Sequence, residues 1–241
     1  MKAASETPER KRKDIAVEEI QKEKQEECLA ARFLEMLETG KKYAELMNKY
    51  RCAIMEVETK LNVLNAEFSL QYDRNPFESI KSRLKSPRSI IGKLLRKDLI
   101  GDEATLAKNI EDNLYDVAGI RVVCAFQEDI YCLADLLTSQ DDIRLIRVKD
   151  YIKNPKPNGY RSLHLIIEVP VFLKEGKTPV KVEVQFRTIA MDFWASVDHK
   201  LRYKKGVENE EEIVEKLRQC ATVIAGLDNE MQKIRSMIEK R

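Results

Sequence analysis

The spacing of apolar residues changes twice along this chain of 241 residues, and this change constrains the fold more than any other feature. From Val180 to Arg187 apolar and polar residues alternate strictly, so an extended strand here has one apolar and one polar side. Toward both ends of the chain the apolar residues recur every three or four positions, which is typical of amphipathic helices. The sequence therefore predicts a core that contains strands, between two helical arms.

The two arms are predicted to be long helices. The N-terminal arm has no proline from Asp14 to Phe68 and a single glycine, Gly40, so it is one helix or two helices that meet near Gly40. Its apolar series is Leu46, Tyr50, Ile54, Val57, Leu61, Leu64 and Phe68. The C-terminal arm, from Val207 to Arg241, carries Ile213, Leu217, Val223, Ile224, Leu227, Met231, Ile234 and Ile238. We expect both arms to serve packing and oligomerisation rather than catalysis.

The region between the arms is predicted to mix strands and helices. Besides the alternating strand, apolar runs predict strands at Ile120–Phe126, Ile143–Val148 and Leu163–Val171, and a helix at Tyr131–Leu137. Strands and helices thus alternate from about Ser86 to Lys204. This order is typical of an α/β or α+β core of the size of a catalytic domain.

Composition excludes several classes of protein. Lys and Arg number 43 and Asp and Glu 41, so the formal net charge of +2 argues against a protein that coats nucleic acid. The sequence has no apolar run long enough for a membrane span and no apolar segment of a signal peptide, which predicts a cytoplasmic protein without a membrane partner. Five scattered cysteines without a C-x-x-C pair, and only two histidines, argue against a zinc site and favour reduced thiols.

A basic cluster marks the start of the core. Seven Lys and Arg residues and no acidic residue lie between Lys81 and Lys97. Ser86 and Pro87 are typical of a helix start, and the helix would bury Ile90, Ile91, Leu94 and Leu95. The cluster is either a solvated helix face or a clamp for polyphosphate or nucleic acid.

Three further clusters lie at predicted strand ends. Asp116 precedes a strand that carries Arg121, although a capping Asp is also common there. Asn158-Gly159 forms a turn that places Tyr160 and His164 at a strand mouth, where Tyr160 is either an ordinary packed ring or a base-stacking one. Glu183 lies with Gln185 on the polar side of the alternating strand, and a carboxylate in that position must be solvated, paired or metal-bound.

Taken together, these clusters predict an enzyme that acts on nucleotide polyphosphates. Asp116 and Glu183 could hold Mg²⁺, which usually takes one or two carboxylates and completes its shell with phosphate and water oxygens. The cationic cluster and an aromatic ring would hold the nucleotides. The sequence has no G-x-x-x-x-G-K-[ST] loop, so side chains rather than a glycine-rich backbone must grip the phosphates.

Five motifs carry a resemblance to a known family. In chain order they are R-x-K (Arg83, Lys85), K-x-x-R (Lys93, Arg96), D-x-A-G-I-R (Asp116 to Arg121), N-G-Y-x-S-L-H (Asn158 to His164) and V-E-V-Q-x-R-T (Val182 to Thr188). They resemble the ppGpp synthetase domain of the RelA/SpoT family, and the chain is similar to the stand-alone small alarmone synthetases of the RelQ and RelP types. The likeness spans about Pro76 to Lys205. It implies an N-terminal helical arm at 1–75, a pyrophosphokinase domain at 76–205 and a C-terminal helical arm at 206–241.

The resemblance implies an α+β fold with a mixed β-sheet, related to nucleotidyltransferases, and a specific reaction. The β,γ-pyrophosphate of ATP would pass to the 3′-hydroxyl of GDP or GTP to give ppGpp or pppGpp in the stringent response, with Mg²⁺ as cofactor. The ATP phosphates would be held by Arg83, Lys85, Lys93, Arg96 and Arg121. Asp116 would bind the metal, and Glu183 would assist it or orient and deprotonate the hydroxyl. The acceptor nucleotide would be held by Lys156, Tyr160, which stacks on guanine, His164 and Gln185.

Several alternatives stay open at this point. A relative that pyrophosphorylates the 3′ end of tRNA, or an inactive synthetase fold that binds RNA, would keep many of these residues. The resemblance implies a homo-oligomer, a tetramer by family precedent, and leaves open whether single-stranded RNA, alarmone or metal binds and regulates it. It implies no hydrolase domain.

Relatives differ at Asp192, to which we assign no role, whereas Trp194 is predicted to be a core anchor and His199 a structural residue. The preference for GDP or GTP, the RelQ or RelP type, and the group that accepts the proton are not decided.

Overall fold

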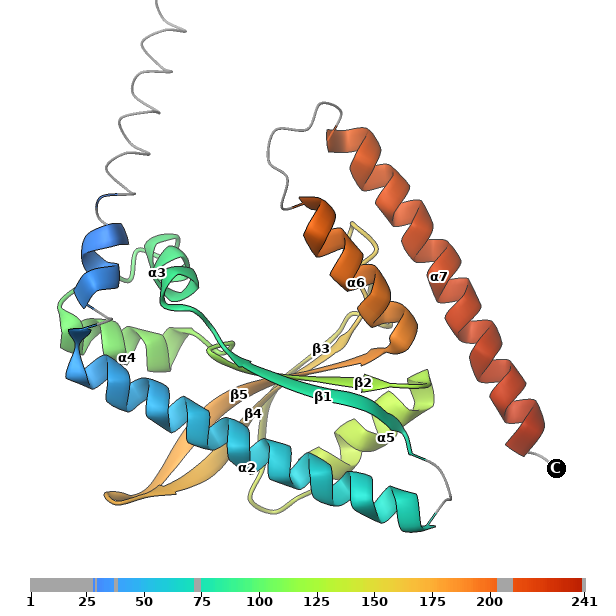
Figure 1. The fold of residues 1–241 in the computed structure, drawn as a ribbon, viewed down its shortest axis with the longest axis horizontal. Coiled ribbons are helices and arrows are strands. Elements are labelled where there is room, and N and C mark those ends of the chain that lie inside the picture. Colours follow the sequence, from blue (N-terminus) through green and yellow to red (C-terminus); the bar gives the residue numbers. More distant parts are fainter. Residues whose placement is uncertain (1–27, 29, 37–38, 72–74, 203–209, 240–241) are drawn as a thin grey trace, which may run out of the picture. The chain divides into compact units, whose positions relative to one another are not determined.

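The computed structural model describes residues 28, 30–36, 39–71, 75–202 and 210–239 (Figure 1). The start of the predicted N-terminal arm at Asp14, the predicted domain junction at 205–206 and the last two residues of the C-terminal arm lie outside them. The chain divides into two compact units. One comprises Met1–Leu46 with Ser86–Asn113, and the other comprises Met47–Lys85 with Leu114–Arg241. Within the described part of the chain, no helix is both long and apolar enough to cross a membrane.

The first unit is helical where it is described. Helix α3 (Pro87–Leu95) begins as predicted: the Ser86 side chain accepts a hydrogen bond from the N–H of Ser89, and Pro87 opens the helix. Its residues Ile90, Ile91 and Leu94 are buried, whereas Leu95 is half-buried. Helix α4 (Glu103–Asn113) follows, with Leu106 and Ile110 buried. No helix was predicted there from the sequence.

The N-terminal arm is interrupted where its glycine stands. Gly40 is not helical, and the long helix α2 (Lys41–Gln71) begins at the next residue. The predicted series of apolar residues is buried along it: Leu46, Tyr50, Ile54, Val57, Leu61, Leu64 and Phe68. In the second unit, Lys60 also pairs with Asp142 at 2.7 Å. The 3.6-residue period therefore predicted the inner face of this helix correctly.

The second unit is built on a mixed sheet of five strands, which confirms the predicted α+β class. The strands are β1 (Phe77–Leu84), β2 (Ala118–Cys124), β3 (Arg144–Asp150), β4 (Leu163–Leu173) and β5 (Gly176–Thr188), in the order β1-β2-β5-β4-β3. The pair β2–β5 is parallel and the other three pairs are antiparallel. Strand β5 thus lies at the centre, between β2 and β4. Four of the five strands were predicted, with ends displaced by a few residues.

Strand β1 was missed because its sequence carries no clear strand pattern. It is an edge strand that pairs only with β2, and Glu78, Lys81 and Arg83 along it are exposed. Charged side chains are common on edge strands because they discourage pairing with another chain. The basic cluster predicted from Lys81 to Lys97 is therefore divided between the two units. The residues up to Lys85, on β1 and directly after it, belong to the second unit, whereas the residues on α3 and directly after it belong to the first unit.

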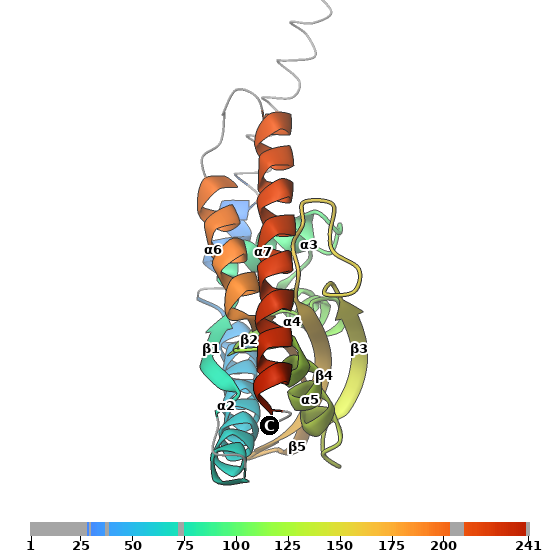
Figure 2. The same cartoon turned by 90° about the vertical axis from the view of Figure 1, so that its right-hand side faces the viewer.

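Three helices of the second unit follow strands of the sheet or pack beside it. They are α5 (Gln127–Thr138), α6 (Ile189–Arg202) and α7 (Glu210–Glu239), the last of which lies beside α6 in both views (Figures 1 and 2). Trp194 is buried between α6 and α7, as predicted for a core anchor, and its indole N–H donates to the carbonyl of Leu217 at 3.0 Å.

The inner face of α7 contains few of the large apolar residues of the series named from the sequence. Its buried residues are Leu217, Ala221, Ala225, Asp228 and Arg235. Most of the large apolar residues of the predicted series are instead at least half exposed: Val223, Leu227, Met231, Ile234 and Ile238. Small side chains let α7 approach its neighbours closely, and two polar residues find partners there: Asp228 with Thr188, and Arg235 with Asp129. The sequence pattern therefore identified the helix but not the side that packs.

Candidate active site

A pocket of about 580 Å³ opens over the polar side of β5. Its walls come from β1, β2, β3, β4, the loop before β4 and the middle of α6. They consist of Arg83, Asp116, Arg121, Lys149, Tyr151, Lys156, Tyr160, His164, Glu183, Gln185, Arg187, Ala195, Ser196, His199 and Lys200. Eight predicted site residues are among them, and a ninth, Lys85, is paired with Asp116. Lys93 and Arg96 belong to the first unit, on and just after α3.

The polar row on β5 follows directly from the alternation of its sequence. Val180, Val182, Val184 and Phe186 are buried on one side, so Glu183, Gln185 and Arg187 point to the other. Strand pairing then adds residues from the neighbouring strands. Gln185 is level with Arg121 of parallel β2 and with His164 of antiparallel β4. Because three strands meet at this level, residues from distant parts of the sequence converge on one pocket.

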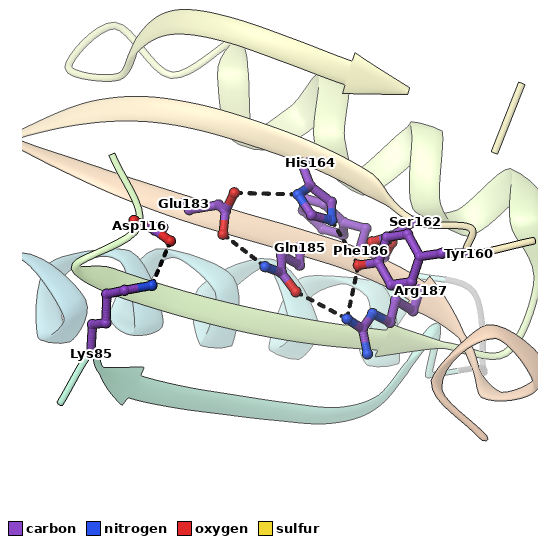
Figure 3. A network of polar contacts seen from close by, with 9 residues as sticks. All are labelled: Lys85, Asp116, Tyr160, Ser162, His164, Glu183, Gln185, Phe186 and Arg187. Carbon is purple, nitrogen blue, oxygen red and sulfur yellow. Dashed lines mark hydrogen bonds and ion pairs between the residues drawn. The ribbon is translucent and has the colours of Figure 1, made fainter. Parts of the chain in front are cut away.

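Five side chains form a continuous hydrogen-bonded group, which we call the β5 network: Tyr160, His164, Glu183, Gln185 and Arg187 (Figure 3). His164 Nδ1 lies 3.2 Å from Glu183 Oε1, and its Nε2 lies 2.9 Å from the Tyr160 hydroxyl. Gln185 Nε2 donates to Glu183 Oε2 at 2.7 Å. Arg187 Nη2 donates to both the Tyr160 hydroxyl and Gln185 Oε1, at 2.9 and 3.1 Å. Each member is thus held by at least two others.

The network keeps Glu183 ionised although its side chain is buried. Burial raises the pKa of Glu183, and the negative charge of Asp116 raises it further. Hydrogen bonds from His164 and Gln185, with the charge of His164, outweigh both effects and leave the pKa below its usual value. Glu183 is therefore a carboxylate at neutral pH, suited to bind a cation or accept a hydrogen bond, and a weak proton acceptor.

Two tyrosines and a lysine form the aromatic wall of the pocket. Lys156 Nζ lies 4.7 Å from the ring centre of Tyr151 and 4.8 Å from that of Tyr160. The Arg187 guanidinium lies 5.3 Å from the Tyr160 ring centre. The rings of Tyr151 and His164 lie nearly perpendicular to each other, with 5.2 Å between their centres. Cations over aromatic rings stabilise both groups, so the rings are held in place before any ligand enters.

The loop that carries this wall is stabilised from its beginning. Asp150, the last residue of β3, accepts hydrogen bonds from the N–H groups of Ile152 and Lys153 and from the Tyr131 hydroxyl. Further on, the N–H of Lys156 donates to the carbonyl of Tyr160, and Gly159 returns a bond to the Lys156 carbonyl. Gly159 has φ +88°, which glycine adopts without strain. This turn places Lys156 and Tyr160 on the same side of the loop.

The opposite wall of the pocket has fewer fixed contacts. Lys85 Nζ lies 2.8 Å from Asp116 Oδ2, and the Lys85 N–H donates to the carbonyl of Val117. Arg121 on β2 donates to Asp192 Oδ1 at 3.1 Å, and the same oxygen accepts from Arg187 at 2.9 Å. Arg83 is exposed at the rim. Asp192 therefore joins this wall to the β5 network.

No role was assigned from the sequence to Lys149, Tyr151 and Arg187, which line the pocket, or to Asp192, which bonds to Arg121 and Arg187. A signal for Arg187 was available, because the polar side of β5 that contains Glu183 and Gln185 continues to it. Lys149 is level with His164 in the β3–β4 pairing, and only that register brings it to the pocket. Asp192 lies in the first turn of α6, and Tyr151 follows β3 directly. Their roles depend on how separate elements meet.

The donor atoms of the pocket fit Mg²⁺. Asp116 and Glu183 line the same pocket, and the charge of Asp116 is one of those that act on the Glu183 carboxylate. Among the described residues no group of three or more His, Cys, Asp or Glu side chains could hold a metal by itself. A site with two carboxylates would leave the other positions to phosphate and water oxygens, as Mg²⁺ prefers.

Comparison with known proteins identifies the family. The model of the region found in RelA / SpoT proteins matches residues 82–208. The chain belongs to the RelA/SpoT family. Among curated RelA/SpoT proteins, GTP pyrophosphokinase YwaC of Bacillus subtilis is 43% identical over 190 residues, which are 79% of this chain and 89% of YwaC. GTP pyrophosphokinase YjbM of the same organism is 32% identical over 200 residues, or 83% of this chain and 92% of YjbM.

Solved structures of the family agree. The crystal structure of small alarmone synthetase 1 from B. subtilis, bound to its product pppGpp, matches with a TM-score of 0.74 at 32% identity, over 82% of this chain and 98% of that chain. Small alarmone synthetase 2 from B. subtilis matches with a TM-score of 0.71 at 40% identity, over 81% and 98%. The resemblance predicted from the five motifs, to the small alarmone synthetases of the RelA/SpoT family, is confirmed.

Proposed function

We propose that this chain is a GTP pyrophosphokinase that transfers the β,γ-pyrophosphate of ATP to the 3′-hydroxyl of GDP or GTP and so makes ppGpp or pppGpp in the stringent response. The observation that carries the proposal is the pocket over β5, in a chain of the RelA/SpoT family. It unites two carboxylates, a set of cations and two aromatic rings on one side of one sheet. We further propose 76–205 as the pyrophosphokinase domain, between helical arms at 1–75 and 206–241.

The wall with Arg83, Lys85 and Arg121 receives ATP. In the reaction, the acceptor's 3′-oxygen bonds to the β-phosphorus, the bond from this phosphorus to the α–β bridging oxygen breaks, and AMP leaves. Negative charge on the phosphate oxygens is stabilised by fixed cations, which do not need to reorganise during the reaction. For Lys93 and Arg96, which belong to the first unit, the phosphate-binding role rests on the resemblance alone.

The β5 network and the aromatic wall receive the acceptor. Tyr160 offers a ring face to guanine, and Lys156, His164 and Gln185 offer polar groups to the rest of the nucleotide. We add Lys149 and Tyr151, which line the same wall. Because the members of the network hold each other, the acceptor meets side chains already in position. Orientation of the 3′-oxygen toward the β-phosphorus accelerates the transfer greatly.

The two carboxylates share one role, and Glu183 has a second. Asp116, paired with Lys85, and Glu183 would hold Mg²⁺, which on binding would neutralise phosphate charge and orient the donor. Glu183 also accepts a hydrogen bond from the 3′-hydroxyl and points its oxygen at the donor. Its lowered pKa makes it a poor final acceptor of that proton, so orientation is its main contribution beside the metal.

A second copy of the chain would pack on the exposed face of α7. Leu227, Met231, Ile234 and Ile238 recur every three or four residues and are at least half exposed. The double variant Leu227→Glu/Ile234→Glu is expected to lower the mass measured by light scattering. A double variant with the same mass in solution as the native protein would contradict this interface.

One assay tests the reaction. Purified protein, Mg²⁺, γ-³²P-labelled ATP and GDP, GTP or deacylated tRNA are combined, and the labelled products are separated. We expect label in ppGpp or pppGpp, and a loss of about 10³-fold in Glu183→Gln, the scale seen when a main electrostatic stabiliser is removed. Glu168→Gln on neighbouring β4, where Glu168 pairs with Arg144 outside the pocket, is the matched control. Label in tRNA alone, or full activity of Glu183→Gln, would overturn the proposal.

A further inference from the structure

We infer that the C-terminal helix α7 positions the loop that binds the acceptor nucleotide, through a close contact between Ala221 and Gly159. The loop, Pro155–Tyr160, is called the acceptor loop here. The inference rests on the proposed function, because it assigns α7 a part in how the same site binds GDP or GTP. It gives α7 a role in the reaction beyond the packing and oligomerisation expected for the arm.

The contact leaves no room for larger side chains. A Cβ atom added at Gly159 would lie 2.4 Å from the Cβ of Ala221 and 3.6 Å from the Cα of Arg218. Carbon atoms that are not bonded to each other do not approach so closely, so either the loop or the helix would have to move. Gly159 is therefore required for this approach as well as for its positive φ. Ala221 is 7% exposed and is the residue of α7 that meets the turn.

Tyr160 itself rests on the same part of α7. Its ring packs against a buried cluster formed by Trp194, Ala195, Leu217 and Ala221. Its hydroxyl reaches the other way, to His164 and Arg187. The ring is thus fixed at one end by the β5 network and supported along its side by α6 and α7.

The acceptor loop needs such support because its backbone does not pair with the sheet. Its backbone hydrogen bonds are internal: the Lys156 N–H to the Tyr160 carbonyl, and the Gly159 N–H to the Lys156 carbonyl. These bonds set the shape of the turn but not its distance from β5. That distance depends on side-chain contacts and on α7.

A second contact links α7 to the other side of the network. Asp228, two turns after Ala221, accepts a hydrogen bond from the Thr188 hydroxyl at 2.8 Å. The Thr188 oxygen in turn accepts from the N–H of Met191, in the first turn of α6 that carries Asp192. Asp192 holds Arg187. The same face of α7 therefore supports both the loop that carries Tyr160 and the helix start that holds its partner Arg187.

The test is a size series at Ala221 with Ser, Val and Leu. As the side chain grows, we expect the KM for GDP or GTP to rise, by about tenfold for Ala221→Leu, since small displacements of a positioning group have large kinetic effects. The Kd for GDP alone, measured by calorimetry, rises in parallel. The KM for ATP and the Kd for a non-hydrolysable ATP analogue stay within about twofold of the native values, because the residues proposed to hold ATP do not lie on the acceptor loop and are not displaced. Val223→Leu, on the exposed side of the same helix turn, is the control and leaves all four values unchanged.

Each outcome decides the inference. Thermal unfolding identifies any variant that fails to fold, and the Ser and Val variants then carry the test. Unchanged GDP binding across the folded series would overturn the inference, as would equal weakening for GDP and the ATP analogue. Native protein that binds GDP but makes no labelled product would overturn the proposed function instead, and the GDP-binding series would still test the contact.

Discussion

The two walls of the pocket are built differently. On the proposed acceptor side, five side chains of the β5 network hold each other through bonds of 2.7 to 3.2 Å. On the proposed donor side, Lys85 is held by Asp116, and Arg121 by Asp192, while Arg83 is exposed. Nucleotide bases and sugars need orientation, which a rigid network supplies. Phosphates and a metal bring strong charges that can draw cations into place, so their wall needs fewer internal contacts.

Among changes that separate the two walls, the largest expected effect comes from Arg187 on the acceptor side. Arg187→Ala removes the guanidinium that bonds to Tyr160, Gln185 and Asp192. We expect kcat/KM for the acceptor to fall by about 10²-fold, with less change in the KM for ATP. Arg187→Lys should recover little, because an ammonium cannot reproduce the fork of contacts. Steady-state kinetics with each nucleotide varied in turn measures both values. A larger effect on ATP than on the acceptor would reverse the assignment of the walls.

A smaller effect, on the donor side rather than the acceptor side, is expected from Lys85→Ala. This change removes the cation beside Asp116, so the donor wall loses a charge for phosphate and the carboxylate loses its partner. We expect the KM for ATP to rise by about tenfold, equivalent to ~1.4 kcal/mol, and the KM for GDP to change little. Lys85→Arg keeps the charge and should retain most of the activity. Acceptor kinetics that change as much as donor kinetics would show that the two walls are not separable.

A shift in pH dependence is expected from His164→Ala. With His164 present, the pKa of Glu183 lies below its usual value, so the stability and activity that need the carboxylate are complete above the ordinary Glu pKa of about 4.3 and are lost as pH falls through the lower folded value. Without His164, only the hydrogen bond from Gln185 still lowers the pKa of Glu183, while burial and the charge of Asp116 raise it. The pKa of Glu183 is therefore expected to rise. The acid limb of the pH–rate profile should move to higher pH. His199→Ala, which removes the other histidine in the pocket, is the control. An unmoved acid limb would exclude His164 as the group that keeps Glu183 ionised.

The smallest effect concerns the scaffold behind both walls. Burial raises the pKa of Asp228, only partly offset by hydrogen bonds from Thr188 and Gln127, so the ionised form weakens folding as pH rises through its folded pKa. Asp228→Asn keeps an oxygen for the Thr188 hydroxyl and removes the charge. We expect the unfolding free energy at pH 7 to be unchanged or higher by up to ~1 kcal/mol, with no gain below the ordinary Asp pKa of about 3.9. Asp228→Ala should lose about 1–2 kcal/mol because Thr188 loses its acceptor. Denaturant unfolding at several pH values distinguishes these results.

Sequence reasoning was most successful where the signal is local. The alternation from Val180 to Arg187 predicted β5 and its polar side, and Ser86 with Pro87 predicted the start of α3. It failed where context decides. Strand β1 is exposed and charged, and α4 has only two buried positions, so neither has a strong pattern. Apart from Leu217, the buried residues of α7 are two alanines and two polar residues, which a search for large apolar side chains passes over.

The candidate site divides in the same way. The motifs contained Asp116, Tyr160, His164, Glu183 and Gln185, and all five line one pocket. The contacts between site residues were not evident. Arg187 bonds to Tyr160 across 27 positions of sequence, and Arg121 bonds to Asp192 across 71. Such pairs depend on how strands and helices pack, and the residue types alone do not single them out.

By itself, the sequence determined the local periods, the helix start at Ser86 and the set of chemical groups that the RelA/SpoT motifs contain. The reason is that helix and strand periods, and the side of an element on which a residue lies, depend on neighbours a few positions away. Only the tertiary structure decided that Gln185 stands level with Arg121 and His164, and that Ala221 supports the turn at Gly159. Strand register and helix packing are set by contacts between segments distant in the chain, where complementary shape and paired polar groups choose one arrangement.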